Sequence, residues 1–158
     1  MAVRFSPGGV LRIPLSEGRA AYGLMLAVRP FMAFHVTEDG TGASSAEAAQ
    51  EALARAPLFT LSVTKTAYSQ GRWGAVLHRV RKEELPAVPE FFRQNALNLA
   101  DCSLVAEDGS VKPVAPERCV GMERDAVWSA EHIESRLEDH FAGRSNAFVE
   151  SIAVKLPG

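Results

Sequence analysis

Residues 10–28 read Val-Leu-Arg-Ile-Pro-Leu-Ser-Glu-Gly-Arg-Ala-Ala-Tyr-Gly-Leu-Met-Leu-Ala-Val, and this stretch decides the predicted fold. Two apolar runs, residues 10–15 and 21–28, flank a polar turn at residues 16–19. This arrangement predicts a β-hairpin with a four-residue loop. Both faces of the second run are apolar, which predicts a strand that is buried on both sides. Gly23 inside that run indicates a bulge or a close approach of the backbone.

Further short strands are predicted where turn residues separate apolar or alternating runs about every eight to twelve positions. These runs cover residues 31–36, 58–64, 73–80, 102–105, 112–114 and 148–156. Ser45 is a good N-cap for an Ala-rich helix that continues to about residue 55. Strands do not alternate strictly with helices. We therefore expect an α+β fold, with a curved antiparallel, barrel-like β-sheet and two main peripheral helices. The length of 158 residues fits a single domain, residues 1–158.

The second main helix is predicted within residues 121–143. Ser129 suits its N-cap, and Gly143 is a typical helix stop. Trp128 precedes the N-cap and is expected to anchor the helix end in the core. Apolar residues recur at a spacing of four and predict the face that packs inward: Ile133, Leu137 and Phe141. The acidic residues lie off that stripe: Glu131, Glu134, Glu138 and Asp139.

The residue types that carry chemistry form no recognisable set. Cys102 and Cys119 lie in separate apolar stretches, which favours buried hydrophobic residues over a disulfide framework. His132 and His140 are eight residues apart with Arg136 between them, a poor arrangement for metal ligands. Neither a Gly-x-Ser-x-Gly elbow nor a phosphate-binding glycine loop is present in the sequence. We expect no catalytic residue, no metal and no cofactor, and a protein that is not an enzyme.

Composition indicates a soluble globular protein, because 47% of the residues are hydrophobic and 23% are charged. The sequence lacks a run of about eighteen apolar residues, so we expect no membrane span. Residues 1–7 lack the apolar run of a secretory signal, so a cytoplasmic location is expected.

Charge is distributed unevenly along the chain. Residues 1–100 contain 11 Lys and Arg against 8 Asp and Glu, whereas residues 101–158 contain 6 against 11. The acidic C-terminal part is unsuited to binding nucleic acid and suited to a cationic partner. In the first part, Arg72 and Trp73 combine two residue types that are frequent in binding hot spots. The alternative is that Trp73 fills the core and Arg72 is simply exposed.

Three segments, taken in their order and spacing, resemble immunity protein 26, a bacterial family of polymorphic toxin systems. They are Ile13-Pro14-Leu15 with Gly18-Arg19 and residues 22–26, then Gly71-Arg72-Trp73, then residues 121–129 with the helix at 133–141. The resemblance covers about residues 8–145. It implies a small cytoplasmic antidote without catalytic residues, which binds and neutralises a cognate toxin domain. That toxin domain is the expected protein partner.

The leading hypothesis is therefore a toxin-neutralising immunity protein. Its candidate partner-binding residues are Glu131, Glu134, Glu138, Asp139, Arg72 and Trp73. Toxin nucleases are often basic because they bind phosphate, and an acidic helix can mimic the charge of their substrate. One alternative is a small β-barrel-type peptide or nucleic-acid binding module with Trp73 and Arg72 exposed. The other is a small enzyme with a spatially assembled Cys–His site.

Overall fold

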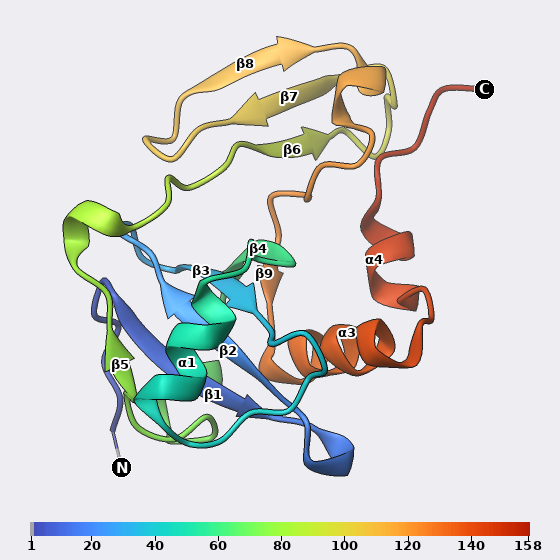
Figure 1. The fold of residues 1–158 in the computed structure, drawn as a ribbon. Coiled ribbons are helices and arrows are strands. Elements are labelled where there is room, and N and C mark those ends of the chain that lie inside the picture. Colours follow the sequence, from blue (N-terminus) through green and yellow to red (C-terminus); the bar gives the residue numbers. More distant parts are fainter. Residues whose placement is uncertain (1) are drawn as a thin grey trace.

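The computed structural model describes residues 2–158, whose strands form two open sheets (Figure 1). The larger sheet has six strands in the order β5-β1-β2-β3-β4-β9, and the smaller has the order β6-β7-β8. The strands are β1 Gly9–Pro14, β2 Ala20–Met25, β3 Phe31–His35, β4 Phe59–Val63, β5 His78–Arg79, β6 Phe91–Gln94, β7 Cys102–Val105, β8 Val111–Val114 and β9 Val127–Trp128. The helices are α1 Ala46–Leu53, α2 Lys65–Ser69, α3 Ala130–Ala142 and α4 Ala147–Ile152. Three single turns of 3-10 helix cover η1 Ser16–Gly18, η2 Lys82–Glu84 and η3 Pro116–Cys119.

The predicted hairpin is formed by β1 and β2, which pair in antiparallel register from Val10 opposite Leu24 to Pro14 opposite Ala20. Every residue of β2 is buried, as its two apolar faces predicted. Gly23 sits in regular pairing, so the bulge is not found, and the atoms that crowd this position belong to side chains rather than to the backbone. A Cβ added there would lie 2.7 Å from Cε of Met32 on β3.

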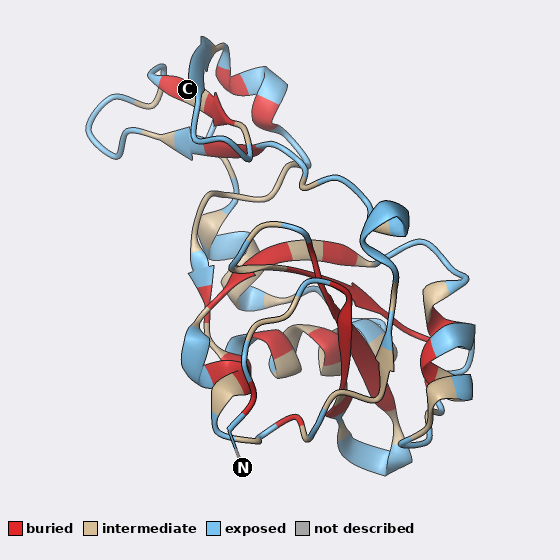
Figure 2. Ribbon diagram, turned by 90° about the vertical axis from the view of Figure 1, so that its left-hand side faces the viewer, coloured by how far each residue is buried: buried red, intermediate tan, exposed pale blue. Residues whose placement is uncertain are grey.

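The larger sheet separates two apolar layers. One layer contains β-sheet residues together with Trp73, Trp128, Ile133 and Leu137, so α3 packs on this face. The other layer is smaller and is covered by Ala49 and Ala52 of α1. Figure 2 shows the buried residues concentrated in the strands of this sheet. The sheet is therefore the rigid support on which α3 is held.

The smaller sheet lies beyond one end of the larger one (Figures 1 and 2). Its own buried cluster consists of Phe92, Cys102, Leu104 and Cys119. Phe91 stacks on Phe31 of β3 with ring centroids 5.3 Å apart, which joins the two sheets. Phe91 and Phe92 are therefore both buried against apolar side chains.

The sequence-based expectation of an α+β fold is confirmed, but the barrel-like closure is not, because the strands divide into two open sheets. The two predicted main helices are confirmed as α1 and α3, and the shorter α2 and α4 bring the number of α-helices in residues 2–158 to four. Within the predicted strand 73–80, only His78–Arg79 pairs, since Gly74 takes a φ of 73° and bends the chain. The predicted strand 148–156 is wrong: Asn146 caps a helix there by accepting a hydrogen bond from the Val149 amide. The predicted hairpin of residues 102–105 and 112–114 is confirmed as β7 and β8.

Candidate functional site

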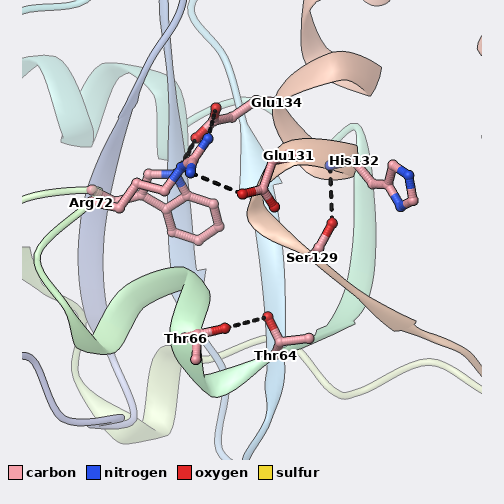
Figure 3. A network of polar contacts seen from close by, with 8 residues as sticks. Thr64, Thr66, Arg72, Ser129, Glu131, His132 and Glu134 are labelled. Atoms are coloured by element: carbon pink, nitrogen blue, oxygen red, sulfur yellow. Dashed lines mark hydrogen bonds and ion pairs between the residues drawn. The ribbon is translucent and has the colours of Figure 1, made fainter.

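The sequence-predicted residues of two distant segments meet at one face of the larger sheet. Arg72 and Trp73 follow α2 through a turn in which Gly71 has a φ of 83°. Glu131 and Glu134 project from the first turns of α3, which begins at the Ser129 N-cap. The Ser129 side chain accepts a hydrogen bond from the His132 amide, as the capping pattern predicted. Figure 3 shows the Arg72 guanidinium reaching across to both carboxylates.

Glu134 is the centre of this contact. Arg72 donates from Nε to Oε2 and from its terminal nitrogen to Oε1, both at 2.8 Å, in a two-pronged pair. The indole Nε1 of Trp73 donates to the same Oε2 at 2.9 Å. Arg72 also donates to Oε1 of Glu131 at 3.1 Å. Glu134 thus accepts a hydrogen bond from the indole nitrogen of the buried Trp73 and two hydrogen bonds from the Arg72 guanidinium.

The protonation of this cluster follows from its contacts. Burial by itself raises the pKa of Glu134, but the hydrogen bonds from Arg72 and Trp73 and the charge of Arg72 outweigh burial and lower it. The hydrogen bonds to Glu134 raise the pKa of Arg72 in turn. Arg72 therefore balances one of the two formal negative charges of Glu131 and Glu134, which leaves one negative charge in excess.

Two further predicted carboxylates belong to other contacts. Glu138 accepts hydrogen bonds from the backbone amide and hydroxyl of Ser16, both at 2.8 Å, and so joins α3 to the β1–β2 turn. Asp139 pairs with Arg144 at 2.9 Å and accepts a hydrogen bond from Asn146. These hydrogen bonds from Arg144 and Asn146 lower the pKa of Asp139.

Exposure differs sharply among the six residues. Trp73 is only 2% exposed and packs edge-on against Phe34, so it fills the core and offers no ring to a partner. The side chains of Arg72 and Glu131 are 42% and 69% exposed, whereas that of Glu134 is 22% exposed. Arg72, Trp73, Glu131 and Glu134 therefore come together, and Glu138 and Asp139 extend the acidic face along the helix.

Sequence reasoning missed the turn of residues 16–18 as a neighbour of this face. Glu17 lies there with a φ of 58°, and its side chain is 74% exposed beside Arg19. The contact between Ser16 and Glu138 spans 122 residues of chain, so no local pattern could have indicated it.

The residues of the alternative enzyme hypothesis do not converge in residues 2–158. Cys102 and Cys119 lie with Phe92 and Leu104 in the buried cluster of the smaller sheet, and no hydrogen bond in residues 2–158 joins either thiol to a histidine. His132 stacks on Phe148 with ring centroids 4.1 Å apart, rather than pairing with a neighbouring carboxylate. No group of three or more His, Cys, Asp or Glu side chains is arranged to hold a metal in the described part of the chain.

The exposed aromatic that a nucleic-acid module needs is not supplied by Trp73, because its ring is buried and its indole nitrogen is bonded to Glu134. No helix in residues 2–158 is long and apolar enough to cross a membrane.

Comparison with known proteins relates the chain to one family. No curated protein and no solved structure matches it. The family model of immunity protein 26 matches residues 6–103, from the approach to β1 into β7. The match includes the opening hairpin and the Gly71-Arg72-Trp73 segment, while α3 lies beyond it. Because the matched residues make up well over half of the sequence, the chain belongs to the immunity protein 26 family.

Proposed function

We propose that this protein neutralises a bacterial toxin by binding its toxic domain, and that it acts by binding rather than by catalysis. Membership of the immunity protein 26 family over residues 6–103 is the observation that carries the proposal. The toxin belongs to a polymorphic toxin system, and neutralisation takes place in the cytoplasm of the cell that makes both proteins.

We further propose that the toxin docks on the acidic face, defined as Glu131, Glu134, Glu138 and Asp139 of α3 with the adjoining turn of residues 16–18. Charge pairing inside the molecule decides which of these groups remain available. Asp139 is balanced by Arg144 and Glu17 by Arg19, whereas Arg72 balances only one of Glu131 and Glu134. Glu138 receives hydrogen bonds from Ser16, which carries no charge that could balance the carboxylate. The unbalanced charge of this face is therefore negative and suits a basic toxin surface.

Co-expression with the toxin domain encoded beside this gene tests the function. Cells producing both proteins are expected to survive, and the purified proteins are expected to form a stable complex. A toxin domain that kills in the presence of this protein and fails to bind it would overturn the proposed function.

Charge reversal tests the docking surface separately. Glu131→Lys combined with Glu138→Lys reverses the charge of the carboxylate that shares Arg72 with Glu134 and of the carboxylate that contacts uncharged Ser16. Glu134, the acceptor of Trp73, is kept. We expect binding to weaken by roughly tenfold or more, with a slower association rate and a smaller dependence on salt. Glu107→Lys is the matched control, since Glu107 is exposed in the turn between β7 and β8. If the wild-type protein binds the toxin and the double variant binds equally well, the acidic face is wrong while the function stands.

A further inference from the structure

The two cysteines of this chain, Cys102 and Cys119, lie in separate apolar stretches of the sequence and converge beside the smaller sheet. Cys102 begins β7, and Cys119 ends η3. The β7–β8 hairpin places Val114 opposite Cys102, and η3 starts two positions later, so its turn carries Cys119 back over the start of β7. Their exposed fractions are 3% and 0%, and both belong to the same cluster of buried residues.

The side chains around the two thiols are apolar. Phe92 and Leu104 complete the buried cluster. The Cys102 thiol donates to the Leu99 carbonyl over 3.6 Å. Burial raises the pKa of the Cys119 thiol, and the nearby Cys102 thiol raises it further. Both cysteines are free in the structure and share one small buried cluster, so the two reduced thiols lie in the same apolar pocket of side chains.

We propose that Cys102 and Cys119 form an oxidation site, which low-molecular-weight disulfides such as glutathione disulfide convert into an intramolecular disulfide bond. The thiolate of one cysteine attacks a sulfur of glutathione disulfide, forms a mixed disulfide and releases one glutathione thiolate. The second cysteine, as its thiolate, then attacks the protein sulfur of that mixed disulfide and releases the other glutathione. The two protein thiols lose two protons and two electrons in total, and the electrons reduce one glutathione disulfide to two glutathione thiols.

Burial determines how this reaction proceeds. A buried thiol with a raised pKa is a poor nucleophile, so attack requires the smaller sheet to open. Opening costs less there than in the larger sheet because its buried cluster contains only four buried residues. Once formed, the bond closes a ring over residues 102–119, which includes β8 and η3. The ring restricts the open state, so hydrogen exchange in β7 and β8 is expected to slow by on the order of 100-fold.

Mass spectrometry of the full-length protein incubated with glutathione disulfide in native buffer tests the proposal. The expected product has lost two hydrogen atoms, contains no covalent link between chains and regains the two hydrogen atoms on treatment with dithiothreitol. Trypsin cleaves after Arg93, Arg118 and Arg124 but not at the Lys112-Pro113 bond. The cross-link should therefore join peptide 94–118 to peptide 119–124 in a non-reduced digest. Stable glutathione adducts, a dimer linked between chains, or no reaction would each overturn the proposal.

Variants and thermal unfolding provide the control. Cys102→Ala and Cys119→Ala each leave a single thiol, which is expected to end as a glutathione adduct or to remain free. The unfolding midpoint of the oxidised wild-type protein should rise above that of the reduced protein, and oxidant should not raise the midpoint of the double Ala variant. A cross-linked wild-type protein whose midpoint does not rise would show that the bond distorts the native packing, and would equally count against the proposal.

Discussion

Glu134 shows how one carboxylate can stabilise two other side chains at once. Replacing it by Ala leaves the indole nitrogen of Trp73 buried without its acceptor and removes both prongs of the Arg72 pair. We expect Glu134→Ala to lower the free energy of unfolding by about 2 kcal/mol. Glu131→Ala is the matched control. It removes a single contact between exposed groups and is expected to cost less than about 1 kcal/mol. Denaturant unfolding measures both; equal losses would contradict the central place given to Glu134.

His35 links stability to pH. It is 4% exposed, its Nδ1 donates to the Arg55 carbonyl at 2.9 Å, and its Nε2 has no partner in residues 2–158. Burial lowers the pKa of His35 below its ordinary value of 6.5, and the Arg55 hydrogen bond only partly offsets this effect. The unfolded chain therefore takes up a proton before the folded one as pH falls. The stability contributed by neutral His35 is complete above pH 6.5 and is lost progressively below it.

Unfolding measured between about pH 7 and pH 5 tests this linkage. His35→Asn keeps a donor in the position of Nδ1 and cannot titrate, so its stability should change less over this range. A variant as sensitive to acid as the wild-type protein would show that other groups cause the loss.

Helix α3 is fixed to the rest of the molecule by Arg136 as well as by Glu134. Arg136 forms a two-pronged pair with Glu123 at 2.8 and 2.9 Å, and its guanidinium lies 3.9 Å from the ring centroid of Phe59. Its side chain is only 15% exposed. Arg136→Ala leaves the Glu123 charge without its partner and is expected to cost about 3 kcal/mol.

The exposed pair between Arg93 and Asp125 provides the comparison. Its nitrogen–oxygen distance is also 2.8 Å, but the Arg93 side chain is 55% exposed. Arg93→Ala is expected to cost less than about 1 kcal/mol. Thermal or denaturant unfolding of the two variants, side by side, checks whether burial rather than distance determines the loss.

Elements with strong local signals could be predicted from the sequence. Ser45 and Ser129 cap α1 and α3, and Gly143 ends α3 with a φ of 69°. Residues 148–156 were assigned wrongly because a short apolar run fits either a strand or a helix. The structure shows a helix there, which Asn146 caps and which packs Phe148 and Val149 against the main core.

The candidate site, too, could be predicted from the sequence only in part. Arg72 and Glu134 stand out separately in the sequence, but their contact spans 62 residues and depends on how α3 crosses the sheet. Trp73 could be read as a binding or a core residue, and only the fold decides for the core. Local patterns therefore identified the participants of the cluster, while tertiary packing determined their roles.

At the scale of the whole molecule, the core of the larger sheet extends beyond the residues that the family model matches. The match ends at residue 103, yet Trp128, Ile133 and Leu137 from beyond it complete the core on one face of the larger sheet. The smaller sheet contributes to a separate cluster and reaches the larger sheet through the stacked rings of Phe31 and Phe91. The C-terminal helices are therefore more closely integrated with the matched strands than β7 and β8 are.

This difference in integration predicts a difference in local stability. Strands β2 and β7 are both central in their sheets, so both have neighbours on each side. However, β2 is buried throughout between two apolar layers, whereas β7 rests on a cluster of only four buried residues. Less apolar surface is exposed when β7 opens, so we expect its amides to exchange with deuterium faster than those of β2 in the reduced protein. Hydrogen-exchange mass spectrometry compares the two strands directly. Equal rates would mean that the stacked rings of Phe31 and Phe91 couple the sheets strongly enough for them to open only together.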